Sequence, residues 1–239
     1  MVPVQNLTQS KFVSIEAALD RWSECHWHIH QIEANYHTPD LFRYSLNSFI
    51  RAVKEIPQIL NMELQNHDYF KTTFKPSIDL LHTNELLSLL HKKRDFLVHR
   101  GMLEVLSKGR VGTTEGRIVK MAMGFHVDSA ESTLQAYERF KELCGNDKSI
   151  RGLLGPDCDS RPYITREWKI QEFPNIDMLD LSIEAWTFTG KILSRVILDL
   201  GDEKLDLSFS CRHEPSKVRT VEFGQREFFM SVDGIDINA

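Results

Sequence analysis

The chain has 239 residues, of which 41% are hydrophobic and 26% are charged, and these values are typical of a folded globular protein rather than a disordered one. Its formal net charge of -5 excludes a general electrostatic attraction to nucleic acid, so any site for a polyanion must be a local basic cluster. The four cysteines are widely separated, which favours reduced thiols over a disulfide framework or a zinc site.

The sequence also bears on compartment. The N-terminal residues contain no basic segment followed by an apolar core, which a secretory signal would require. No apolar run reaches the roughly 18 residues that are needed to span a bilayer. We therefore expect a cytoplasmic protein that has no membrane partner and no cofactor.

Two helices are predicted in the first third of the chain. Apolar residues recur at three- and four-residue steps from Phe12 to Trp22, which predicts a helix over about residues 10–36. A second apolar stripe begins near Leu41. Proline lacks a backbone donor, so we expect this second helix to be kinked or interrupted at Pro57.

The middle of the chain changes character twice. Residues 67–79 contain Pro76 and predict an irregular connection. A long apolar helix is then predicted over residues 84–106. Glycines punctuate two short apolar segments at about residues 109–127, which predicts a β-hairpin.

The last part of the chain is predicted to be less regular. A helix is expected to start near Asp128, and residues 145–174 are expected to be mostly loop. Residues 175–201 predict a strong final helix, and short alternating stretches in the tail, 202–239, predict strands.

These elements predict a mainly α fold with a β-hairpin insertion and a short β-containing C-terminal tail. We expect a helical domain over residues 1–145, with the hairpin inserted in it. Residues 146–239 would add a loop, a long helix and the tail, packed on the same body.

The helix predicted over residues 84–106 carries the segment Arg94–His99, whose sequence is Arg-Asp-Phe-Leu-Val-His. A guanidinium can hold two phosphate oxygens, and an imidazole can give or take a proton near neutral pH. On an ideal helical wheel Asp95 and His99 share one stripe, so the carboxylate can hold or polarise the imidazole. Arg94 lies about 140° from His99 and must bend toward the stripe or reach into a partner subunit.

These side chains suit the cleavage of a phosphodiester. RNA supplies its own nucleophile, the 2′-OH, so no metal ion is obligatory. We expect Lys92, Lys93 and Arg100 to steer the RNA. One histidine cannot easily act as base and acid in the same step, so a homodimer with two copies of His99 at one phosphate is expected. The alternative is a solvated helix face with an Asp95–His99 contact.

The motif resembles the signature of the HEPN family of all-helical domains, in which an arginine is followed by Asn, Asp or His and then by a histidine. Arg94, Asp95 and His99 match all three elements of that signature. The aromatic-rich segment Phe42–Ile50 is similar to the long helix that precedes the motif in this family. The resemblance covers roughly Phe12 to Leu106.

The resemblance implies a HEPN-like helical bundle and a metal-independent endoribonuclease that acts as a homodimer. It assigns catalysis to Arg94, Asp95 and His99. Many members belong to toxin–antitoxin or phage-defence systems, which implies an antitoxin or inhibitory protein as a partner. Other members are non-catalytic modules that bind proteins or nucleotides, and this remains the alternative.

Other patterns predict packing or turns more than chemistry. His26 and His30 have the spacing of metal ligands on a helix, but no carboxylate-rich partner segment is evident. The glycine-rich segment Gly109–Gly116 lacks a phosphate-binding pattern. Trp168 and Trp186 could stack on bases, although we expect them in the core.

Overall fold

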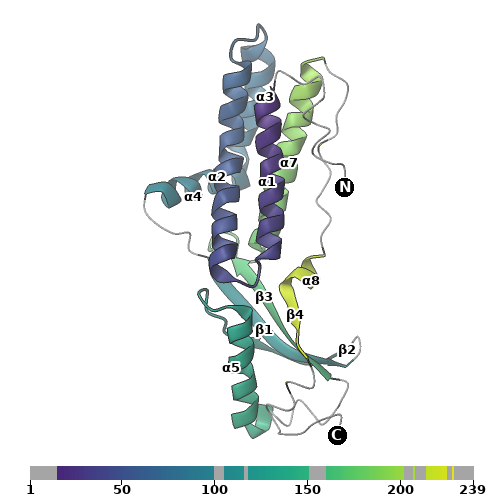
Figure 1. The fold of residues 1–239 in the computed structure, drawn as a ribbon. Coiled ribbons are helices and arrows are strands. Elements are labelled where there is room, and N and C mark those ends of the chain that lie inside the picture. Colours follow the sequence, from purple (N-terminus) through teal and green to yellow (C-terminus); the bar gives the residue numbers. More distant parts are fainter. Residues whose placement is uncertain are drawn as a thin grey trace. The chain divides into compact units, whose positions relative to one another are not determined.

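The computed structural model describes residues 15–99, 105–115, 118–150, 160–201, 207, 214–224 and 228. These residues divide into two compact units (Figure 1). The first unit draws on the segments 1–34, 42–104 and 179–212, and the second draws on 35–41, 105–178 and 213–239. The units therefore interleave along the chain, whereas the sequence predicts one boundary between residues 145 and 146.

The first unit is helical. Its elements are α1 (Glu16–Ala34), α2 (Pro39–Leu64, which enters the unit at Phe42), the π-helical turn η3 (Phe70–Phe74), α3 (Lys75–Thr83), α4 (Glu85–His99) and α7 (Met178–Asp199, which enters it at Leu179). Figure 1 shows α1, α2 and α7 as long helices that run side by side. These helices confirm the helices predicted from about residue 10 to 36, from Leu41 onward, from about residue 84 onward and over residues 175–201, whereas the irregular connection predicted over residues 67–79 is wrong where η3 and α3 lie.

A pair of tryptophans joins α1 to α7. The rings of Trp22 and Trp186 stack with centroids 4.6 Å apart, and each indole donates a hydrogen bond of 3.0 Å to the backbone carbonyl of the other residue. A Cβ at Gly190 would lie only 2.9 Å from the Trp22 ring, so the absence of a side chain there permits the close approach. His26 stacks on the same Trp186 ring, with centroids 4.4 Å apart. This contact gives His26 a role in packing.

Two prolines behave differently from their prediction. Pro57 lies inside α2, which runs through it without interruption, so the predicted interruption is wrong, whereas the predicted kink stays a prediction. The helix tolerates the lost hydrogen bond because packing of its long apolar face supplies most of its stability. Pro76 was expected to oppose a helix, yet it lies in the first turn of α3, where a backbone N–H has no helical partner anyway.

The helix predicted over residues 84–106 is shorter in the structure. Helix α4 ends at His99, and Leu106 already belongs to a strand. Residues 100–104, and with them Arg100, lie outside the described part of the chain.

The second unit contains a four-stranded antiparallel sheet. Its strands are β1 (Leu106–Glu115), β2 (Ile118–Phe125), β3 (Ser160–Lys169) and β4 (Thr220–Glu222), in the order β2-β1-β3-β4. The predicted hairpin is confirmed as β1 and β2. The prediction of loop is wrong for β3, which pairs with β1 along its whole length, from Leu106 opposite Lys169 to Glu115 opposite Ser160.

Helix α5 (Thr133–Asn146) packs against one face of this sheet, and the short helix α8 (Pro215–Arg219) precedes β4. The core between α5 and the sheet is made of Val111, Val127, Ala136, Tyr137, Phe140, Cys144, Ile164 and Phe228. Ser132 caps α5 by accepting a hydrogen bond from the Gln135 backbone N–H at 3.2 Å, and the Gln135 side chain accepts one from Ser132 N–H at 2.8 Å. This reciprocal cap fixes where the helix begins.

Gly112 lies in the middle of β1 and not at the hairpin turn. It stands directly opposite Tyr163 of β3, and a Cβ at this position would lie 2.7 Å from the tyrosine hydroxyl. The glycine therefore allows the Tyr163 ring to lie across the strand. This packing explains why position 112 is a glycine, and no phosphate site is needed to explain it. Across the helices that the structure describes, none combines the length and the apolar character required to cross a membrane.

Candidate functional site

Helix α4 carries the predicted catalytic segment. Leu86, Leu87 and Leu90 are buried and fix the N-terminal half of the helix to its unit. The Asn84 side chain accepts a hydrogen bond of 3.0 Å from the Leu87 backbone N–H, which caps the helix start. In Figure 1 the C-terminal end of α4 extends away from the other helices of its unit.

Arg94 and Asp95 form a polar cluster with Lys54 of α2. The Asp95 Oδ1 atom accepts a hydrogen bond from the Lys54 ammonium group, and Arg94 Nη1 lies 3.4 Å from the same oxygen. Two cations on different helices therefore converge on a single carboxylate oxygen. The exposed fractions of the side chains are 17% for Lys54, 52% for Asp95 and 32% for Arg94.

The cations stabilise the ionised form of Asp95. The hydrogen bond from Lys54 makes the largest contribution to lowering the pKa of this carboxyl, and Arg94 adds to it, as expected for a carboxylate beside two positive charges. Asp95 is thus a carboxylate throughout the neutral range. Sequence reasoning missed Lys54, because it lies 41 residues before Asp95 and only the packing of α2 against α4 brings them together.

The Arg94 guanidinium has donor capacity that Asp95 does not use. Its Nε atom is buried, and no atom among the described residues accepts a hydrogen bond from it. A guanidinium presents five N–H donors, and buried donors are normally satisfied. The buried Nε is not open to an incoming ligand, but the side chain as a whole is 32% exposed, so a phosphate oxygen can approach the exposed part of the guanidinium.

His91 lies one turn before Asp95 and faces His82 of α3, with ring centroids 5.9 Å apart. The pKa of His91 is lowered to about 4, mainly by burial and also by the nearby His82 and Lys54, against a smaller opposite effect of Asp95. Within the described residues nothing pairs with the His91 Nε2 atom. The imidazole is therefore neutral at physiological pH.

We expect His91 to make the protein less stable in mild acid. Its pKa is about 4 in the folded state and about 6.5 when unfolded, so between these values the unfolded chain binds a proton that the folded chain does not. The contribution of His91 to the free energy of unfolding is thus fully present above about pH 6.5 and is lost as the pH falls toward 4. Urea unfolding from pH 7 to 4.5 should show a flatter pH dependence for His91→Gln than for wild type.

An NMR titration of the His91 side chain measures its pKa directly. A midpoint near 6.5 would contradict the prediction that this pKa is lowered. His82→Gln is a matched variant. Removing that imidazole should raise the His91 midpoint, since His82 is one of the groups that lower it.

The remaining predicted residues are placed only in part. Lys92 is exposed and Lys93 is half-buried on α4. His99 is the last residue of α4, but its side chain and Arg100 lie outside the described structure, so the Asp95–His99 contact stays a prediction. Among the side chains that the structure describes, no three His, Cys, Asp or Glu residues converge as metal ligands would.

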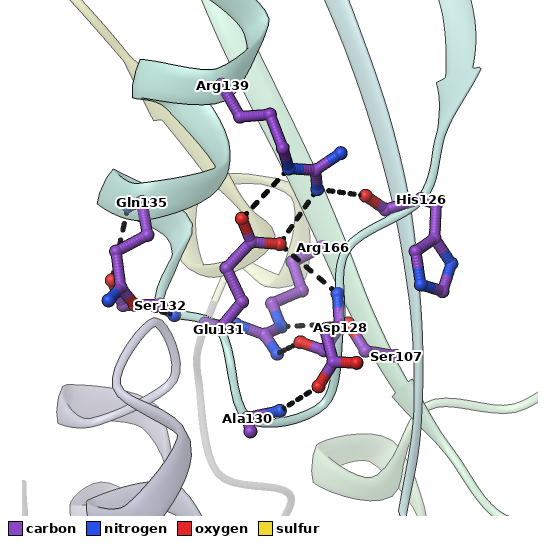
Figure 2. A network of polar contacts seen from close by, with 9 residues as sticks. All are labelled: Ser107, His126, Asp128, Ala130, Glu131, Ser132, Gln135, Arg139 and Arg166. Atoms are coloured by element: carbon purple, nitrogen blue, oxygen red, sulfur yellow. Dashed lines mark hydrogen bonds and ion pairs between the residues drawn. The ribbon is translucent and has the colours of Figure 1, made fainter.

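A second polar network lies in the sheet unit and is built differently (Figure 2). Arg166 of β3 is fully buried. It donates to the backbone carbonyls of Asp128, at 2.9 Å, and Glu131, and to the Ser107 hydroxyl at 3.0 Å. Its guanidinium also lies 3.7 Å from the Trp168 ring centroid. Figure 2 shows it beneath the turn that leads into α5, so it fastens this turn to the sheet.

Burial lowers the pKa of Arg166 to about 10, which still leaves the guanidinium charged at neutral pH. On the outer side of the same turn Glu131 accepts hydrogen bonds from Arg139 at 2.8 and 3.1 Å. The carbonyl and hydroxyl partners of Arg166 use its donors inside the unit. The network is structural, and α4 is therefore the better candidate for chemistry.

Part of the chain is similar to a known sequence family. Residues 11–119 match a sequence family described as bacteriophage lambda protein ea47. No curated protein and no solved structure matches the chain. The matched stretch spans α1 to α4 and β1, so it contains Lys54, Arg94, Asp95 and His99.

Proposed function

We propose that the protein is a metal-independent endoribonuclease that uses the C-terminal half of α4. The observation that carries the proposal is the cationic cluster of Lys54 and Arg94, in which two cations share one Asp95 oxygen and the Arg94 side chain is 32% exposed. Lys92 adds an exposed positive charge on the same helix. In a chain with a net charge of -5, such a local cluster suits a phosphate of RNA.

In this mechanism the 2′-OH attacks the adjacent phosphorus, and the 5′-oxygen of the next nucleotide leaves, so the products are a cyclic phosphate and a 5′-hydroxyl. Arg94 stabilises the extra negative charge of the transition state, and His99 transfers protons. A homodimer would supply a second His99, so that one acts as base and the other as acid.

The second candidate is a non-catalytic HEPN-like module that binds a partner protein or nucleotide. One observation favours it: Lys54 and Arg94 already hold the Asp95 carboxylate, an arrangement that requires no proton transfer. A binding module would keep the cationic cluster and lose the proton transfer.

Cleavage of single-stranded RNA in excess chelator separates the two candidates. We expect wild-type protein to cut the RNA, and His99→Ala to cut at least about 10²-fold more slowly, since general acid–base catalysis contributes about 10²–10⁴. A substrate with 2′-deoxyribose at the cut position should resist cleavage. Equal cleavage by wild type and His99→Ala would reject this active site, and no cleavage by either would favour the binding module.

The phage similarity suggests a setting for the activity. The matched family is described by a bacteriophage protein, and ribonucleases serve as toxins or defence proteins in conflicts between phages and bacteria. An antitoxin or other inhibitory protein would then be the partner that restrains the enzyme in the cytoplasm.

A further inference from the structure

Lys54 belongs to no sequence motif, yet it occupies a fixed place beside Arg94. Its side chain is 17% exposed, so the aliphatic stem is largely buried along α2 while the ammonium group reaches Asp95. A lysine normally keeps its charged end in water and moves freely. Here burial of the stem sets the position of the charge.

The Lys54–Asp95 pair differs from an isolated surface ion pair because Arg94 shares it. Both cations use Oδ1 of Asp95, so one negative charge compensates two positive charges and the cluster retains a net positive charge. The two cations also repel each other at this short separation.

A phosphodiester satisfies this cluster better than the carboxylate does. Its two non-bridging oxygens can accept from Lys54 and Arg94 separately, and charge-assisted hydrogen bonds of this kind are the stronger ones. The Asp95 side chain is 52% exposed, so it can turn into solvent when a phosphate takes its place.

We infer that Lys54 is a phosphate ligand of this site and that Asp95 is an internal anion which the RNA phosphate displaces from Lys54 and Arg94. The inference rests on the proposed RNA substrate and deepens it by naming a ligand from α2. It assigns Asp95 two states, bound to Lys54 and Arg94 in the free protein and turned into solvent after RNA binds.

Binding of a single-stranded 2′-O-methyl oligoribonucleotide tests this inference without any cleavage, because the attacking hydroxyl is blocked. Fluorescence anisotropy at several salt concentrations gives the affinity and its salt dependence. Lys54→Met keeps the buried stem and removes the charge. It should weaken binding about tenfold and reduce the slope of log K against log salt by about 0.7, the loss of one phosphate contact on a single strand.

Asp95→Asn is the opposing variant. Removing the competing charge should tighten binding about five- to tenfold, the reverse of the effect of Lys54→Met. Lys191→Met, which removes an exposed lysine of α7, is the matched control and should bind as wild type does.

Each outcome decides the inference. Wild-type affinity in Lys54→Met, weaker binding in Asp95→Asn, or no binding by wild type would overturn it. Binding that changes as expected in a protein that cleaves no RNA would support the phosphate site and reject the proposed ribonuclease, so the two failures are distinguishable.

Discussion

Replacing Arg94 by alanine should slow RNA cleavage by about 10²–10³, the usual effect of removing one preorganised donor to a developing oxyanion. The loss should appear in the single-turnover rate at saturating RNA, because the guanidinium acts mainly on the charge that develops during 2′-OH attack. Arg94→Lys should recover only part of the rate, since an ammonium group cannot bind two phosphate oxygens in the planar geometry of a guanidinium.

The fold should survive this change, because the Arg94 side chain is 32% exposed and lies near the end of α4. Arg195→Ala is the control, since this arginine of α7 is 63% exposed, and its rate should match wild type. Circular dichroism checks that all variants are folded. If Arg94→Ala cleaved RNA at the wild-type rate, the assignment of α4 as the active element would be wrong.

Replacing Trp186 by alanine should have the largest effect on stability, lowering the free energy of unfolding by about 3–5 kcal/mol. The side chain is 1% exposed and stacks on both Trp22 and His26. Its removal leaves a cavity between α1 and α7 and takes away the donor to the Trp22 carbonyl. The measurement is equilibrium unfolding in urea followed by circular dichroism, with Cm and slope fitted separately.

Trp27→Ala is the matched control. This tryptophan lies on the same α1 helix but is 57% exposed, so its loss should change stability by less than about 0.5 kcal/mol. A similar loss in both variants would show that the Trp22–Trp186 pair is not a centre of the helical packing. The two variants also differ in the tryptophan fluorescence that they lose. Trp186→Ala removes a buried indole that stacks on Trp22, whereas Trp27→Ala removes an exposed indole.

The helices of the first unit were predictable because their information is local. An amphipathic helix shows its apolar stripe within two or three turns, and this period placed α1, the start of α2 and α7 without knowledge of their neighbours. Pro57 misled the prediction, since a local rule against proline does not weigh the packing of a whole long helix. Pro76 misled the prediction because a proline is compatible with the first turn of a helix and disrupts the later turns, so its effect on α3 depends on where that helix begins.

Strand β3 could not be predicted in the same way. Its sequence contains Pro162 and the charged Arg166, which argue locally for a loop. It forms a strand because β1 supplies backbone partners along ten paired positions. Arg166 is accepted in the core only because the turn before α5 and Ser107 supply its acceptors.

The sequence by itself determined that the chain is mainly helical and that Arg94, Asp95 and His99 fall within two turns of one helix, since both follow from a periodicity of a few residues. Only the tertiary structure decided that Lys54 meets Asp95 and Arg94, and that a buried Arg166 ties a turn to the sheet. Contacts between distant segments depend on how whole helices and strands pack, and no short stretch of sequence contains that information.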